Sequence, residues 1–142
     1  MGRGAGRAFF YLVLAQAFHS IEEYYFRLWD FLPPARVVSR ALSVDPAYGF
    51  AFANSALVLF GLWCFLLPVR RSWPAARIVM WCWCVVEAMN GAIHLALATV
   101  AGGYVPGLYT APLLLASSAW LFRLLRREPA PPPGAGSVTA HN

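Results

Sequence analysis

The sequence predicts an all-α protein, a bundle of four transmembrane helices with both termini in the cytoplasm. Of its 142 residues, 60% are hydrophobic and 12% are charged, whereas about 25% of the residues in an average soluble domain are charged. Four apolar segments, at about 8–30, 48–68, 76–100 and 105–124, approach or exceed the roughly 20 residues that cross a bilayer. We therefore expect a multi-pass protein of the cell membrane, with residues 1–127 forming a single domain.

The basic residues predict the orientation of these spans. All eleven are arginines, and eight of them precede the first span, separate the second from the third, or end the fourth. These eight are Arg3, Arg7, Arg70, Arg71, Arg77, Arg123, Arg126 and Arg127, against Arg27, Arg36 and Arg40 near the first connection. Because cytoplasmic loops are enriched in arginine and lysine, both termini are expected in the cytoplasm. The net charge of +5 then reflects topology and contacts with membrane lipids, and we expect no nucleic-acid partner.

The first span, about 8–30, carries three polar residues in an apolar background: His19, Glu22 and Glu23. At positions i, i+3 and i+4 of a helix, His19 faces both carboxylates. His19 would lie roughly 16 Å, and Glu23 roughly 22 Å, from the cytoplasmic start of the span. The beginning of this span resembles a signal peptide, but the apolar run continues past the possible cleavage site at Ala17, so we expect it to be retained.

The connection from Phe31 to Tyr48 is the longest predicted loop. Pro33 and Pro34 should break the first helix. The segment ARVVSRALS that follows is expected to form a short amphipathic helix on the outer leaflet. Its Arg36 and Arg40 share one helical face and would contact anionic head groups or solvent.

The third span, about 76–100, carries a second polar set, Glu87, Asn90 and His94, at i, i+3 and i+7. This spacing forms one stripe on a helix. Glu87 would lie roughly 15 Å and His94 roughly 25 Å into the span, which is the depth of the first set. We therefore expect the two polar stripes to face each other inside the bundle.

The fourth span, about 105–124, follows the sequence Tyr104-Val105-Pro106-Gly107, which is typical of a turn. Residues 128–142 are rich in proline, glycine and alanine and are expected to be disordered. The three cysteines, Cys64, Cys82 and Cys84, have no C-x-x-C spacing and predict no disulfide framework.

Placing glutamates inside spans is costly, about 2.5–3.5 kcal/mol for a charge at the bilayer centre, so these residues need partners or protons. One alternative is purely structural: His19 would pair with Glu23 and Glu87 with His94, which would hold the helices in register. Another is that Glu23 pairs with Arg27, four residues later, which would leave Glu22 as the inward-facing carboxylate.

Three motifs in this order resemble the HXXEE family of small bacterial and archaeal membrane proteins. They are His19-x-x-Glu22-Glu23, Asn90-x-x-x-His94 and Tyr104-x-Pro106-Gly107, the last followed by Leu108-Tyr109-Thr110-Ala111. The resemblance covers about residues 10–125. It implies a multi-span membrane protein with shared polar residues and supplies no settled activity.

The chemistry of these residues favours an acid/base enzyme of the isomerase, cyclase or epoxide-opening type. The substrate would be a small hydrophobic molecule that enters from the membrane, and the catalytic candidates are His19, Glu22, Glu23, Glu87, Asn90 and His94. We expect neither a metal nor another cofactor, since Asn90 is a poor metal ligand and a buried glutamic acid can stay protonated without a cation. The alternative is a Zn, Fe or Mn site, because two histidines and up to three glutamates suit these metals. The oligomeric state is left open.

Overall fold

The computed structural model describes residues 3–127, and within this range the chain is helical, with no strand. The elements are α1 (Arg3–Tyr25), α2 (Leu28–Phe31), α3 (Pro33–Leu42), α4 (Pro46–Cys64), the π-helix η1 (Phe65–Val69), α5 (Ala76–Ala101) and α6 (Ala111–Arg127). The predicted all-α class is confirmed. The tail predicted to be disordered, 128–142, lies outside the described residues.

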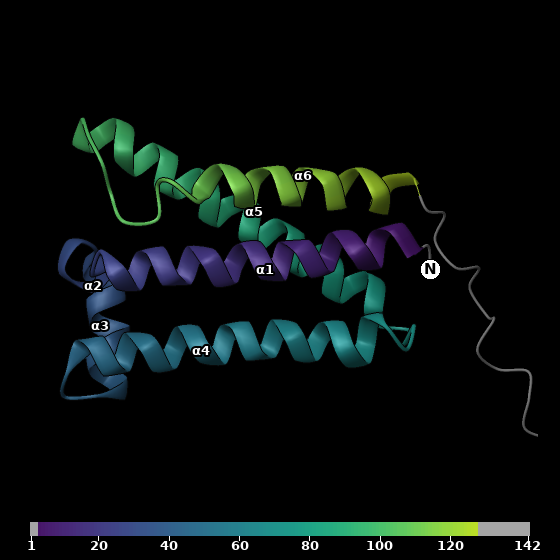
Figure 1. Ribbon diagram of the computed structural model, residues 1–142, viewed down its shortest axis with the longest axis horizontal. Helices are drawn as coiled ribbons and strands as arrows, with labels where there is room; N and C mark the ends of the chain where they lie inside the picture. Colours follow the sequence, from purple (N-terminus) through teal and green to yellow (C-terminus); the bar gives the residue numbers. More distant parts are fainter. Residues whose placement is uncertain (1–2, 128–142) are drawn as a thin grey trace, which may run out of the picture.

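Helix α1 is the central element. In Figure 1 it lies between α4 and α6, with α5 behind, and it contacts all three of these helices. Helices α5 and α6 form the most extensive pair. Gly91 on α5 permits this approach, because a Cβ atom there would lie 2.9 Å from the carbonyl oxygen of Ala111.

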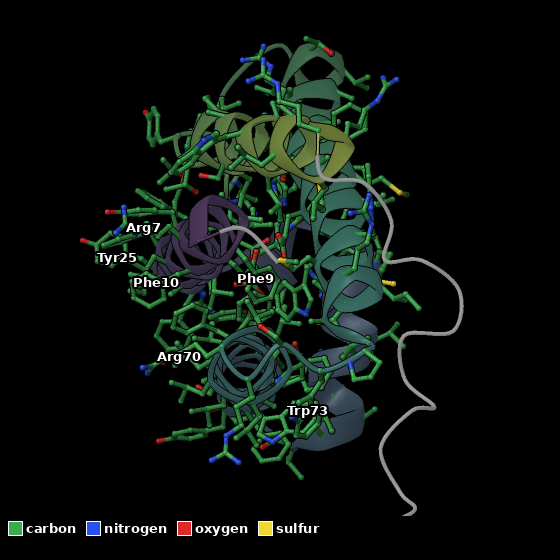
Figure 2. The ribbon with its side chains drawn as sticks, turned by 90° about the vertical axis from the view of Figure 1, so that its right-hand side faces the viewer. Arg7, Phe9, Phe10, Tyr25, Arg70 and Trp73 are labelled. Atoms are coloured by element: carbon green, nitrogen blue, oxygen red, sulfur yellow. The ribbon has the colours of Figure 1, made fainter. Side chains whose placement is uncertain are left out.

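The apolar core fills the half of the bundle nearest the N-terminus. Figure 2 shows Phe9 pointing toward the space between α1, α4 and α5, whereas Phe10 and Tyr25 point away from it. Phe9 is fully buried and packs edge-on against Trp83 of α5, with ring centroids 6.1 Å apart. Burying aromatic side chains of this size is a large contribution to packing, so this cluster fixes how α1 and α5 are aligned further along.

Two helical segments in the described part of the chain are long and apolar enough to cross a membrane, Pro46–Val69 and Ala76–Ala101. The first and last helices begin and end at other residues than the sequence predicts. Helix α1 ends at Tyr25, because Arg27 has a left-handed backbone, with φ of 56°. Helix α6 begins only at Ala111, since turns occupy the preceding residues 106–110.

A helix does form in the long connection, as α3, and it packs against α4. Gly49 allows this contact, because any Cβ atom there would overlap the carbonyl of Ser39. Arg36, an exposed residue, also has partners within the chain that the sequence analysis did not predict. Its guanidinium donates hydrogen bonds to the carbonyl oxygens of Trp29, at 2.9 Å, and Asp30, at 2.6 Å, so Arg36 ties α3 to α2.

Candidate functional site

Two histidines and a glutamate meet between the C-terminal halves of α1 and α5. His19 and Glu23 lie one turn apart on α1, and His94 faces them from α5. His19 is 0% exposed, His94 3% and Glu23 6%. The apolar packing of α1 on α5 therefore carries three polar side chains into an enclosed space, which we call the His–Glu cluster.

Each histidine directs its Nε2 atom toward the same carboxylate oxygen of Glu23. His94 Nε2 lies 3.1 Å, and His19 Nε2 3.4 Å, from Glu23 Oε1. The imidazole rings are nearly perpendicular, with centroids 4.6 Å apart. The three potential ligand atoms, one from each residue, all lie within 4.8 Å of one another. This compact convergence is the central feature of the site.

Glu22 faces a different part of the molecule, the loop of residues 102–110 between α5 and α6. Its Oε1 accepts hydrogen bonds from the Tyr104 hydroxyl at 2.8 Å and the Tyr109 backbone N–H at 3.0 Å. Its Oε2 accepts from the backbone N–H of Thr110 at 2.8 Å and from the Thr110 hydroxyl at 2.6 Å. Four donors on one buried carboxylate anchor the loop to α1, and Figure 1 shows this loop descending from α5 toward α1.

The hydrogen bond between Tyr104 and Glu22 also affects the protonation of Tyr104. Burial, together with the hydrogen bond and the negative charge of Glu22, raises the pKa of the Tyr104 hydroxyl above its ordinary value. The neutral phenol is therefore the form that holds the loop to Glu22.

Gly107 closes the loop over the His–Glu cluster. Its φ is +92°, and a Cβ atom there would lie 2.6 Å from Cε1 and Nδ1 of His94 and 2.8 Å from Cε1 of His19. Both imidazoles are buried, so neither ring has room to yield. The predicted Tyr104-x-Pro106-Gly107 turn is thus in direct contact with the site, and only glycine satisfies both the backbone angle and the space.

Glu87 and Asn90 lie farther toward the N-terminus of α5. Glu87 is 1% exposed, and its Oε2 has no hydrogen-bond partner among the described residues. The Asn90 side chain donates to Gln16 Oε1 of α1 at 3.4 Å. These two residues adjoin the His–Glu cluster along α5, and no direct bond from either of them to the cluster is formed within residues 3–127.

Four residues without a predicted site role also belong to this polar interior. Gln16 continues the chain from Asn90 by donating to Ser20 Oγ at 3.0 Å, and Ser20 donates to Asn54 Oδ1 of α4 at 2.7 Å. Thr110 lies 2.8 Å from His19 Nδ1. A usable signal existed for Gln16 and Ser20, which lie at helical spacing before His19 and Glu23 on the same apolar helix. Asn54 and Thr110 required knowledge of how the helices are arranged.

Two pairings considered from the sequence are wrong. Arg27 pairs with Asp30, at 2.7 Å, while Glu23 faces the histidines. The reason is that α1 ends before Arg27, so the expected i, i+4 helical relation with Glu23 is lost. His94 pairs with Glu23 rather than with Glu87, since seven helical residues correspond to about 10 Å along the axis.

The fold and site define a class: an all-helical protein with an enclosed histidine–carboxylate cluster between two long helices, α1 and α5. The sequence profile of the HXXEE family, described as "Protein of unknown function with HXXEE motif", matches residues 10–121. The chain belongs to this family, which confirms the resemblance. It matches no curated protein and no solved structure.

Proposed function

We propose that this protein is a four-span integral membrane protein, with both termini cytoplasmic, whose His–Glu cluster binds a divalent transition-metal ion. The membrane part of the proposal is supported by the two apolar helical segments that are long enough to span. Helices α1 and α6 lie beside them, and the charged side chains of Glu22 and Glu23 on α1 are buried inside the protein. Inward-facing charges of this kind are typical of functional sites within membranes.

The observation that carries the metal proposal is the pair of nitrogen-to-oxygen separations at Glu23. Ligands about 2.1 Å from a tetrahedral ion lie about 3.3–3.4 Å from one another. The two nitrogen-to-oxygen separations at Glu23 Oε1 are 3.1 and 3.4 Å. A charge-assisted N–H···O bond is usually about 2.7–2.9 Å long, so the His19 separation suits two ligands of one ion better than a direct bond.

The chemistry of the three donor groups narrows the choice of metal. Two imidazoles and one carboxylate form a set that suits Zn, Fe or Mn and leaves further coordination positions for water or a substrate. Asn90, a poor ligand, donates to Gln16 and forms no bond to the cluster among the described residues. The geometry thus shifts the preference from the cofactor-free chemistry that the sequence favours toward a metal centre.

The test is metal analysis of the full-length protein purified in detergent without chelators. We expect about one Zn, Fe or Mn per chain, because a histidine–carboxylate triad supplies enough ligands for tight binding. Glu23→Gln and His94→Ala should lose the metal, whereas Glu87→Gln, which changes a carboxyl outside the cluster, should retain it. A metal-free wild-type protein that also fails to bind added Zn²⁺ would refute the proposal.

The acid/base enzyme on a lipophilic substrate is the second candidate, and Glu87 favours it. A buried carboxyl oxygen without a partner costs about 1–3 kcal/mol, and a reactive role would explain why it is kept. An open pocket of about 520 Å³ between α1 and α4, lined mainly by apolar side chains, reaches the polar pair Ser20 and Asn54, although Glu87 does not line it. Its test is a small hydrophobic molecule that copurifies with the protein and is converted by the wild type but not by Glu87→Gln.

A further inference from the structure

The Thr110 hydroxyl links a carboxylate to a histidine of the cluster. We propose that Thr110, held by Glu22, is a positioning residue that keeps the proton of His19 on Nδ1 and thereby turns a bare Nε2 toward the metal. This inference rests on the proposed metal site and adds the loop of residues 102–110 to it.

The Thr110 hydroxyl has a single hydrogen to donate. Its possible acceptors are Glu22 Oε2 at 2.6 Å, His19 Nδ1 at 2.8 Å and the carbonyl oxygen of Gly107 at 3.5 Å. Glu22 also accepts from two backbone N–H groups and the Tyr104 hydroxyl, so it acts as an acceptor throughout. A hydrogen bond to an ionised acceptor is about twice as strong as a neutral one. The Thr110 hydrogen is therefore committed to Glu22.

The direction of the Thr110 hydroxyl determines which nitrogen of His19 carries a hydrogen. With its hydrogen committed, Thr110 Oγ1 meets His19 Nδ1, 2.8 Å away, as an acceptor, so Nδ1 must carry the hydrogen. A neutral imidazole has one N–H and one lone pair, which leaves the lone pair on Nε2. That nitrogen is buried without a hydrogen-bond partner among residues 3–127 and faces Glu23 Oε1 at 3.4 Å. Two acceptors that face each other need a proton or a metal ion between them, and in the proposed site the metal ion takes this place.

This arrangement would prepare His19 to bind a metal ion. Metal-ligating histidines usually donate their other N–H to a carboxylate, carbonyl or water, which fixes the tautomer and the ring orientation. Here the carboxylate of Glu22 reaches His19 through the Thr110 hydroxyl. Because Thr110 lies at the end of the loop, immediately before α6, the position of the loop and the readiness of His19 to bind metal are coupled.

The experiment compares Thr110→Val, which keeps the shape but loses the hydroxyl, with Thr110→Ser, which keeps the hydroxyl. Zn²⁺ affinity is measured on full-length protein in detergent, and Co²⁺ absorption reports the coordination geometry. We expect Thr110→Val to bind about 10–100-fold more weakly, the usual effect of losing an outer-shell partner, and to change the Co²⁺ spectrum. Thr110→Ser should restore the wild-type values.

A second measurement does not depend on any variant folding. Nitrogen-15 spectra of the imidazoles in the metal-free wild type should identify His19 as the Nδ1–H tautomer. A protonated Nε2 would overturn the inference, and so would equal Zn²⁺ affinities for Thr110→Val and wild type. Failure of the wild type itself to bind Zn²⁺ would instead refute the proposed function, so the two failures are distinguishable.

Discussion

Replacing Gly107 with alanine tests whether the loop is fitted against the histidines. Two separate costs arise at this position. The backbone has φ of +92°, and the new methyl carbon would lie 2.6 Å from two atoms of the His94 ring and 2.8 Å from His19 Cε1. The neighbouring glycines separate these costs. Gly102 has φ of +67° with open space around it, and Gly103 has open space without a positive φ.

The expected magnitudes follow from these differences. A left-handed backbone costs an alanine about 1–2 kcal/mol, and forcing a methyl group into a packed site costs about 1–3 kcal/mol. Gly107→Ala should therefore lower the free energy of unfolding by about 2–5 kcal/mol. Gly102→Ala should lose only the backbone part, about 1–2 kcal/mol, and Gly103→Ala should stay within about 0.5 kcal/mol of the wild type.

The assay is equilibrium unfolding of the three variants in one detergent, combined with their Zn²⁺ affinities. Only Gly107→Ala should weaken Zn²⁺ binding, since only its methyl group displaces the imidazoles or lifts the loop. If Gly107→Ala unfolded and bound Zn²⁺ like Gly102→Ala, the close fit of the loop on the histidines would be wrong.

Two further predictions concern orientation and the loop anchor. A reporter fused after Asn142 should be active only in the cytoplasm, because eight of the eleven arginines lie on that side of the proposed spans; activity only outside would reverse the topology. In an alkaline absorbance titration Tyr104 should ionise later than a free tyrosine, since its pKa is raised. The stability that its neutral form contributes should be present below pH about 10 and be lost as pH rises further. Tyr104→Phe should remove that late step, and an unchanged titration curve would contradict the assignment.

Much of the helical architecture could be predicted from the sequence, because apolar segments of about 20 residues leave few alternatives to helices. The limits of the helices were less accessible. The left-handed Arg27 and the turns before Ala111 are local backbone choices, decided by contacts such as those of Glu22 with the loop. A hydropathy pattern does not contain these contacts.

The candidate site, too, could be predicted from the sequence only in part. Helical spacing places His19 beside Glu23, and this needs only the sequence. Which residue of α5 meets them depends on how the two helices are aligned, and Phe9 packed against Trp83 contributes to this alignment. The result joins His94 to Glu23 at 3.1 Å, whereas the sequence of α5 alone offers Glu87 as its partner. Thr110 was beyond prediction because its loop returns to α1 from a distant part of the sequence.

The two adjacent glutamates of the H-x-x-E-E motif are best understood through helical geometry. Neighbouring residues on a helix diverge by about 100°, so Glu22 and Glu23 cannot serve one small site equally. Glu23 joins both histidines, and Glu22 holds the loop through Tyr104, Tyr109 and Thr110. Thr110 then returns to His19, so the loop held by one glutamate touches the cluster formed by the other. The motif therefore encodes both the ligands of the proposed centre and the anchor of the segment that encloses it.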